Sequence, residues 1–361
     1  MSTSIGASPS TTTPSASTNP SLSTGLPPGW VVRPATPDDA DVAWEVTAAF
    51  DRSVVGRPDM TRDEVRDVIE EVRAEAKADT DVNALLVLDA DSTARGFCYV
   101  FPKHGSDLVD IDLYADPAVD RHDGLDLSGW LLTQVERRAA EHGRAAGLAS
   151  VRADKGCYRQ DETSRQMLEA RGYVMATTFN RMRVELEGPP DEQPPSPPPG
   201  YRVRHVDAGD EAGLRAAHAV REASFDQHFG SVARPYEEWY ASLAARSEVD
   251  FSQLWLVETD EGEPVAMVLN TDAFVEDDNA GYVLSIGTVT QHRGRGLARL
   301  LLQISFADMR RRGRVAAILH VDTANVTDAL RLYESVGMRP VLQVDIWRRT
   351  IETGVRGDAE A

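Results

Sequence analysis

Apolar residues recur along the chain with two periods, and each period predicts one kind of element. From Gly281 to Ile286 an apolar, β-branched run predicts a strand. Further on, the apolar residues have helical spacing, at Leu297, Leu300, Leu301, Ile304 and Ala307. The loop between them contains Gly294 and Gly296, which tolerate positive φ and let the backbone approach a ligand. Because the first amides of a helix have no intrahelical acceptor, this segment predicts an anion-binding corner.

The same two patterns predict two successive sets of elements. In the first half we expect strands near 30–34, 83–88, 96–101, 108–114, 149–152 and 174–186, with helices near 38–50, 60–77, 127–142 and 160–171. In the second half we expect strands at 201–206, 252–259, 264–271, 281–289, 315–321 and 339–350, with helices at 209–227, 235–246, 297–312 and 326–336. The matching order predicts one α/β (α+β) fold written twice, the alternative being a chance likeness of two unrelated domains.

Changes in composition mark the domain boundaries. Residues 1–28 consist mainly of Ser, Thr, Pro, Ala and Gly, which predicts a disordered tail. Residues 187–200 are rich in Pro and predict an extended linker. We therefore expect domains at 29–186 and 201–352, followed by a disordered C-terminus at 353–361.

The charge balance narrows the range of partners. The chain has 38 basic and 58 acidic residues, a net charge of −20, which disfavours nucleic acid and anionic membranes and favours cationic or neutral substrates. Cys98 and Cys157 form neither a CxxC motif nor a metal-ligand pattern, so we expect no metal. With no membrane-spanning run and no signal peptide, the sequence predicts a soluble cytoplasmic protein, either a monomer or a homodimer.

The loop from Arg293 to Ala298 has the sequence Arg-Gly-Arg-Gly-Leu-Ala. In this motif the second half resembles the GNAT superfamily of N-acetyltransferases, whose signature is Arg or Gln, two residues, Gly, one residue, then Gly or Ala. A second family element follows, in which Asn325 is a suitable N-cap, Tyr333 lies on an apolar helix face and Gly337 ends the helix. The resemblance covers about residues 200 to 350. It implies two tandem domains, each with a mixed, mostly antiparallel twisted sheet flanked by helices.

This resemblance also implies acetyl-CoA as the co-substrate. Backbone amides of the loop and of the following helix would hold its pyrophosphate, and its pantetheine arm would lie along the preceding strand, where the family splays two strands apart. The implied cofactor-binding residues are Ile286, Gly287, Thr288, Arg293, Gly294, Arg295, Gly296, Leu297, Ala298, Arg299, Asn325, Ala329 and Leu330. As alternatives to cofactor binding, the arginines could be solvated surface charges, and Asn325 could serve only to cap the helix.

The implied reaction is the attack of a neutral amine on a thioester. Tyr333 would protonate the departing thiolate, and a backbone N–H near Thr288 would stabilise the oxyanion. A carboxylate acting through water would be the base, and we select Glu276, which the sequence does not separate from Asp277 and Asp278. The alternative for Tyr333 is a core aromatic residue, and the alternative for the three acidic residues is a solvated acidic turn. Further candidates for the base are His218, His228, His292 and His320.

The acceptor pocket is expected between the first two helices of the second half. His228, Tyr236 and Trp239 fall in that region, with simple packing as the alternative. The acidic residues nearby suggest a cationic amine as acceptor, either a small molecule or a peptide.

The corresponding residues of the first half differ. Its loop runs from Arg121 to Asp126, so a carboxylate stands at the phosphate corner. Counting back from Gly172, Leu168 replaces Tyr333 and Gln160 replaces Asn325. We therefore expect a degenerate first domain and an N-acetyltransferase active in the second. A non-catalytic acyl-CoA-binding or interaction module is the alternative.

Overall fold

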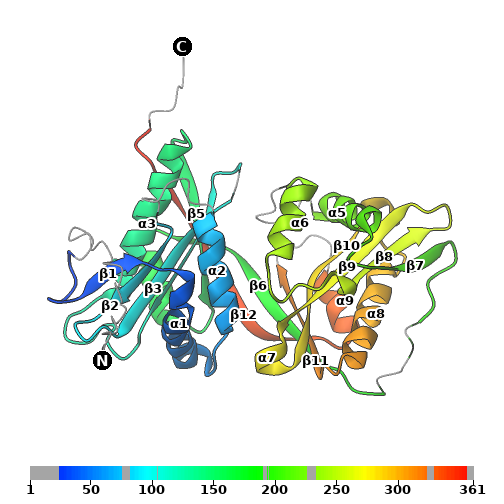
Figure 1. Cartoon of the computed structure of the whole chain (residues 1–361), viewed down its shortest axis with the longest axis horizontal. Coiled ribbons are helices and arrows are strands. Elements are labelled where there is room, and N and C mark those ends of the chain that lie inside the picture. The colour runs from blue at the N-terminus through cyan, green and yellow to red at the C-terminus, as the bar shows by residue number, and fades with distance from the viewer. Residues whose placement is uncertain are drawn as a thin grey trace, which may run out of the picture.

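A computed structural model describes residues 24–74, 82–103, 105–189, 193, 195–225, 233–322 and 329–355, apart from the side chains of residues 276 and 277. The two halves of the chain lie side by side (Figure 1). The first comprises β1 (Val31–Pro34), α1 (Ala40–Val55), α2 (Arg62–Ala74), β2 (Ala84–Leu88), β3 (Ala94–Pro102), β4 (Leu108–Ala115), α3 (Leu127–Ala145), β5 (Ser150–Tyr158), α4 (Glu162–Ala170) and β6 (Val174–Glu185).

The second half repeats this order with one extra helical turn, α7. It comprises β7 (Tyr201–Val206), α5 (Glu211–Phe225), α6 (Tyr236–Ala244), β8 (Leu254–Thr259), β9 (Pro264–Phe274), α7 (Val275–Asp278), β10 (Ala280–Thr288), α8 (Leu297–Arg311), β11 (Ala316–Asp322), α9 (Ala329–Ser335) and β12 (Arg339–Glu352). The described part of the linker predicted at 187–200 contains neither helix nor strand.

One continuous sheet runs through both halves. Its strand order is β1-β2-β3-β4-β5-β12-β6-β11-β10-β9-β8-β7, which reads the same from either end when each strand is exchanged for its counterpart. The halves thus exchange their last strands, because β12 pairs with β5 and β6 pairs with β11. Only the β4–β5 and β10–β11 pairs are parallel among those described. The predicted mixed, mostly antiparallel architecture is confirmed.

Helices cover both faces of the sheet. Alternate residues of a strand point to opposite faces. In β2 of the first half, Leu86 therefore packs in the cluster under α1 and α2, whereas Leu85 and Val87 pack in the cluster under α3. In the second half, α5 and α6 cover one face and α8 and α9 the other.

One predicted strand was much too short. The strand expected at 149–152 continues to Tyr158. Its extension contains Asp154, Lys155 and Gly156, of which Asp and Gly are residue types that favour turns. Lys155 is nevertheless buried, and its ammonium pairs with the carboxylate of Asp112 at 2.6 Å. A buried charge is tolerated in a strand when an opposite charge compensates it.

The described ends of the chain are fixed by contacts. The indole N–H of Trp130 donates to the carbonyl of Thr24 at 3.0 Å, so the last residues of the predicted tail have a defined position. At the other end, the Thr353 hydroxyl donates to the carbonyls of Leu148 and Ala149. The tail up to residue 23 and residues 356–361 lie outside the described residues.

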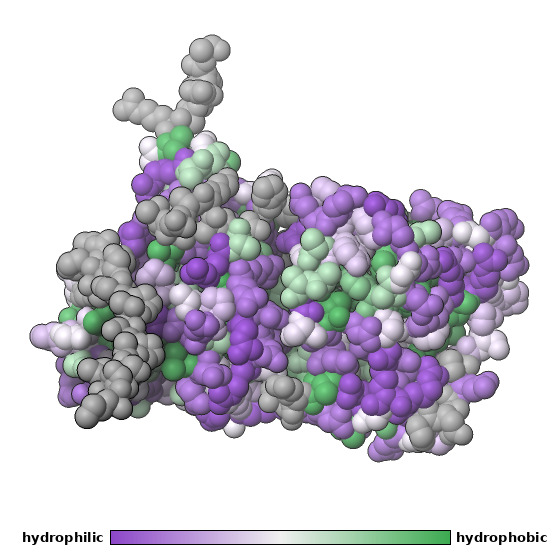
Figure 2. All heavy atoms as spheres, viewed as in Figure 1, coloured by the Kyte–Doolittle hydropathy of each residue, from purple (hydrophilic) through white to green (hydrophobic). Residues whose placement is uncertain are grey.

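The exposed surface is predominantly polar. Figure 2 shows hydrophilic residues over most of this face of both halves, with small apolar areas between them. None of the helices in the described ranges has the length and apolar character needed to cross a bilayer. The described residues contain no cluster of three or more His, Cys, Asp or Glu side chains that could ligate a metal.

Candidate active site

A cavity of about 620 Å³ opens where β10 and β11 separate. The two strands pair only from Ala280 to Tyr282, and a bulge interrupts β10 between Val283 and Ser285. The cavity walls come from the end of α5, from β10 and the loop that follows it, and from β11 and α9. Phe179 on the exchanged strand β6 completes the wall, so the first half contributes to it.

The N-terminus of α8 lies at one end of this cavity. Gly296 is its N-cap residue, with φ of 81°, and no side chain caps the helix. A Cβ atom at Gly294 or Gly296 would meet nothing within 4 Å. Leu297 and Ala298, in the first turn, line the cavity. Their amides have no intrahelical acceptor, so this end of the helix can bind an anion.

Three arginines surround this corner without carboxylate partners among the described residues. Arg293 donates to the carbonyls of Thr288 (3.1 Å) and Ser224 (3.3 Å), which joins the end of β10 to α5. Arg299 donates to the Ser335 carbonyl at 3.4 Å. Arg295 donates to the Tyr201 hydroxyl at 2.9 Å and does not line the cavity. Because neutral groups accept all these bonds, the positive charge of the corner is not cancelled by them.

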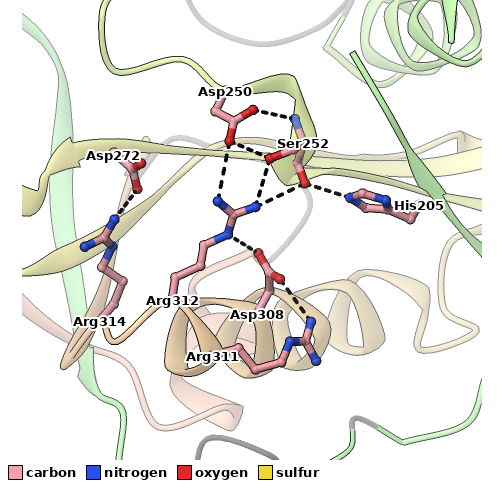
Figure 3. A network of polar contacts seen from close by, with 8 residues as sticks. All are labelled: His205, Asp250, Ser252, Asp272, Asp308, Arg311, Arg312 and Arg314. Atoms are coloured by element: carbon pink, nitrogen blue, oxygen red, sulfur yellow. Dashed lines mark hydrogen bonds and ion pairs between the residues drawn. The ribbon is translucent and has the colours of Figure 1, made fainter. Parts of the chain in front are cut away.

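The opposite end of α8 is anchored by an ionic network (Figure 3). Asp308 accepts hydrogen bonds from Arg311 and Arg312. Arg312 also donates to the hydroxyl of Ser252 at 3.0 Å and lies 3.4 Å from the carboxylate of Asp250. Cations near a helix C-terminus interact favourably with the helix dipole. The network ties α8 to the segment before β8 and so helps to set the position of the phosphate corner.

The edge of β10 facing β11 offers unpaired polar groups. The Val289 amide donates to the Val265 carbonyl on the β9 side at 3.0 Å. Because successive amides point to opposite edges of a strand, those of Ile286 and Thr288 point toward β11, where the strands have separated. Three hydroxyls that line the cavity, those of Ser224, Ser285 and Thr288, have no partner among the described residues.

Tyr333 projects from α9 into the cavity wall and is 7% exposed. Burial raises its pKa to about 12, so the hydroxyl keeps its proton at neutral pH. The helix ends in a Schellman motif, in which the Met338 amide donates to the Tyr333 carbonyl at 3.1 Å and Gly337 has φ of 90°. The predicted helix end at Gly337 is confirmed.

Two polar residues of β11 lie at this cavity: Asp322, which the sequence analysis did not select, and His320, which it gave as one of several candidates for the base. Asp322 accepts a short hydrogen bond from the Thr177 hydroxyl and is the one carboxylate among the described lining residues. The Arg181 guanidinium donates to His320 Nε2 at 2.9 Å, and burial lowers the pKa of His320 to about 4. A lone Asp at a strand end has no spacing signal, which is why sequence patterns missed Asp322.

Some of the predicted cofactor-binding residues lie elsewhere or outside the description. Asn325 belongs to residues 323–328, which the structure does not describe. Ala329 lines the cavity, but Leu330 packs against the apolar core. Leu332, together with Ala329 and Tyr333, takes the cavity-facing positions, because residues three and four apart share a helix face.

The predicted base and acceptor residues are only partly described. The side chain of Glu276 and all of His228 are outside the description. No residue of α7 is among the described lining residues of the cavity, and Asp278 at its end pairs with Arg57 at 2.8 Å. Trp239 lines a second, adjoining cavity.

Tyr236 packs at the rim of α5 and α6 rather than in either cavity wall. Its ring lies beneath the Arg215 guanidinium, 4.0 Å away, and beside His218.

In the first half the equivalent corner is occupied by the protein's own carboxylates. Asp126 is the N-cap of α3 and accepts from the Gly129 amide at 3.0 Å. Asp120 accepts from the Ser128 amide at 2.9 Å. Asp126 directly precedes α3, just as Gly296 directly precedes α8. Matching the two loops by sequence instead places Asp126 opposite Ala298, two residues further on. The conclusion drawn from the sequence is unaffected, since a carboxylate still faces the helix N-terminus.

The remaining equivalent positions also differ from the second half. Leu168 accepts from the Tyr173 amide at 3.0 Å, just as Tyr333 accepts from Met338. It is fully buried and offers no proton donor. The space between β4 and β5 is a cavity of about 180 Å³, and the Lys155–Asp112 pair lines it.

Comparisons with known proteins agree with this arrangement. Residues 217–338 match the acetyltransferase (GNAT) family. A mycothiol acetyltransferase of Thermomonospora curvata is 31% identical over 231 residues, which cover 62% of this chain and 73% of that protein. Another, of Thermobispora bispora, is 29% identical over 270 residues, covering 70% and 79%. The tandem layout with its complete motif in the second half likewise resembles mycothiol synthase.

Solved structures give the same result. A GCN5-related N-acetyltransferase from Sphaerobacter thermophilus has a TM-score of 0.71 and 26% identity, covering 91% of this chain and 97% of that one. A tandem GNAT protein from the clavulanic acid biosynthesis pathway has a TM-score of 0.63 at 13% identity, covering 90% and 99%, and shares the fold. The chain therefore belongs to the GNAT family of N-acetyltransferases.

Proposed function

We propose that this protein transfers the acetyl group of acetyl-CoA to a primary amine, with its active site in the cavity between β10 and β11. The contrast between two equivalent helix N-termini is the observation that supports this location. At α8 no side chain caps the amides, and three arginines lie nearby. At α3 the Ser128 and Gly129 amides are bonded to carboxylates. A pyrophosphate is attracted to the first site and repelled from the second.

The residues present at the cavity fit acetyl-CoA. The amides of Gly296 to Arg299 would hold the pyrophosphate, while the β10 edge and the unpartnered hydroxyls of Ser224 and Thr288 would bond to the amide groups of the pantetheine arm. When bound, acetyl-CoA supplies the activated acetyl group. Gly287 allows α5 to approach β10, because a Cβ atom there would lie 2.7 Å from Cβ of Ser224.

The protein's own groups would position the reactants and move protons. The amides of Ile286 and Thr288 point to the side where an oxyanion would form. Tyr333 holds a proton for the departing sulfur. Glu276 stays a prediction for the base, and Asp322, which lines the cavity, is the alternative that the geometry favours.

We further propose that the first half, residues 29–186, is a degenerate domain that supports the second. Its β6 supplies Phe179 to the cavity, and Arg181 on the same strand bonds both to His320 and to Asp59 of the first half. The alternative function, a non-catalytic acyl-CoA-binding module, gives no reason for Tyr333 and an open phosphate corner to occur together.

Titration calorimetry and an assay of CoA release test the proposal together. We expect one acetyl-CoA to bind per chain, and CoA release to require an added amine. Two sites of similar affinity would contradict the degenerate first half. Binding without CoA release from any of a broad set of amines would instead support the non-catalytic module.

A further inference from the structure

A second cavity adjoins the candidate active site at the boundary between the halves. Its volume is about 350 Å³, and it shares Arg221, Phe225, Leu284 and Ser285 with the first cavity. α6 and β9 of the second half form half of the remaining wall, and α2 and the residue after β3 contribute from the first half. Figure 1 shows α2 and α6 on either side of this boundary. Because the two cavities share these residues, a molecule in the second could extend into the first.

The charged side chains in this wall are mostly cationic. Four are positive, Lys103, Arg221, Arg234 and Arg246, whereas Glu71 is the single negative one described. A cationic wall is unexpected in a chain with a net charge of −20. The local sign therefore differs from the average sign of the protein, and it is the local sign that acts on a bound ligand.

Arg234 is the one of these four cations for which no described carboxylate forms an ion pair. It is half-buried in the cavity wall. The acidic partners of the other three cations lie outside the cavity wall: Glu222 beside Arg221, Glu248 beside Arg246 and Asp110 beside Lys103. A guanidinium has five N–H groups, so these pairs leave donors for a ligand.

The rest of the wall is apolar except at the junction between the cavities. Trp239, Leu243 and Leu269 are buried and supply the apolar surface. The Ser285 hydroxyl, which lines both cavities, has no hydrogen-bond partner among the described residues. A ligand that matches this wall has a short apolar body, a polar group near Ser285 and an anionic end.

We propose that the acceptor is a primary amine that also carries an anionic group, of the carboxylate or phosphate type. The anion lies against Arg234 and its neighbouring cations, and the amine reaches the first cavity beside Ser285. This inference rests on the proposed function, because it assigns the acceptor of the same active site. It replaces the cationic acceptor that the net charge of the chain suggested.

Matched acceptors that differ only in charge test the proposal. We would measure CoA release with γ-aminobutyrate, aminopropylphosphonate and butylamine, of which the first two separate a carboxylate from a phosphate preference. We expect kcat/KM for at least one anionic amine to exceed that for butylamine by about tenfold to a hundredfold, the range for one hydrogen bond to a charged group. Arg234→Met should remove this preference through KM, and Arg234→Lys should restore part of it.

Arg215→Met is the matched control, because Arg215 lies on α5 outside both cavities and pairs with Glu211 and Glu237. It should leave the preference unchanged. Equal or better use of butylamine would overturn the inference and leave the proposed function intact. If no amine releases CoA although acetyl-CoA binds, the proposed function fails. In that case calorimetric titration with γ-aminobutyrate and with aminopropylphosphonate decides the inference: binding of either that Arg234→Met abolishes supports it, and absence of binding by both overturns it.

Discussion

Replacing Gly296 with Asp would give α8 the carboxylate that blocks α3. The backbone has room, since a Cβ atom there meets nothing within 4 Å. A residue with a side chain at φ of 81° costs roughly 1–2 kcal/mol. The new carboxylate would cap the helix and interact favourably with its dipole, which stabilises the fold by about 0.5–1 kcal/mol. The protein should therefore unfold within a few °C of the wild type, at about 2–4 °C per kcal/mol.

Acetyl-CoA binding should be affected far more than stability. A carboxylate about 5 Å from one phosphate charge is repelled by about 3 kcal/mol at an effective dielectric constant of about 20, and it also competes for the helix amides. The Kd measured by titration calorimetry should therefore rise by more than about a hundredfold.

Gly296→Ala separates the effect of charge from that of backbone strain. It carries the same conformational cost without the carboxylate, so it should weaken binding by about tenfold at most. The reverse change, Asp126→Gly, should leave the acetyl-CoA affinity of the second half unaltered. A Kd for Gly296→Asp within about threefold of the wild-type value would refute the assignment of this corner to the pyrophosphate.

Three further predictions concern catalysis, folding and pH. Tyr333→Phe should retain acetyl-CoA affinity and lower kcat by about 10²-fold or more, and an unchanged kcat would remove Tyr333 from the mechanism. A fragment of residues 187–361 should fail to give a cooperative unfolding transition, since its β12 would lose β5 and β6, and a stable fragment would contradict this. Burial raises the pKa of Glu64 from 4.5 to about 7, so the protonated form favours the fold. The stabilisation is complete below pH 4.5 and is lost as the pH rises through 7, by about 3 kcal/mol, and urea unfolding of Glu64→Gln should show a flatter pH dependence.

Much of the candidate site could be predicted from the sequence because its signals are local. The phosphate corner depends on a few consecutive residues, in which glycine permits positive φ at Gly294 and Gly296 immediately before an amphipathic helix. Tyr333 precedes Gly337 by one helical turn, and the Schellman motif that sets its position is formed within the same segment. The degenerate corner of the first half was equally visible, since the carboxylate of Asp126 acts on the helix that it begins.

Only the tertiary structure decided which distant segments meet. The exchange of β6 and β12 between the halves depends on backbone pairing across more than 150 residues, for example Asp345 with Cys157, and strand pairing of that kind carries no local signature. This exchange brings Phe179 of the first half into the wall of the candidate active site and Arg181 into contact with His320 there. The cationic second cavity also depends on tertiary packing. Lys103 belongs to the first half and Arg221 and Arg234 to the second, so these cations share a wall only after folding. Composition determined the average charge of the protein, but long-range packing determined the charge that a substrate would meet.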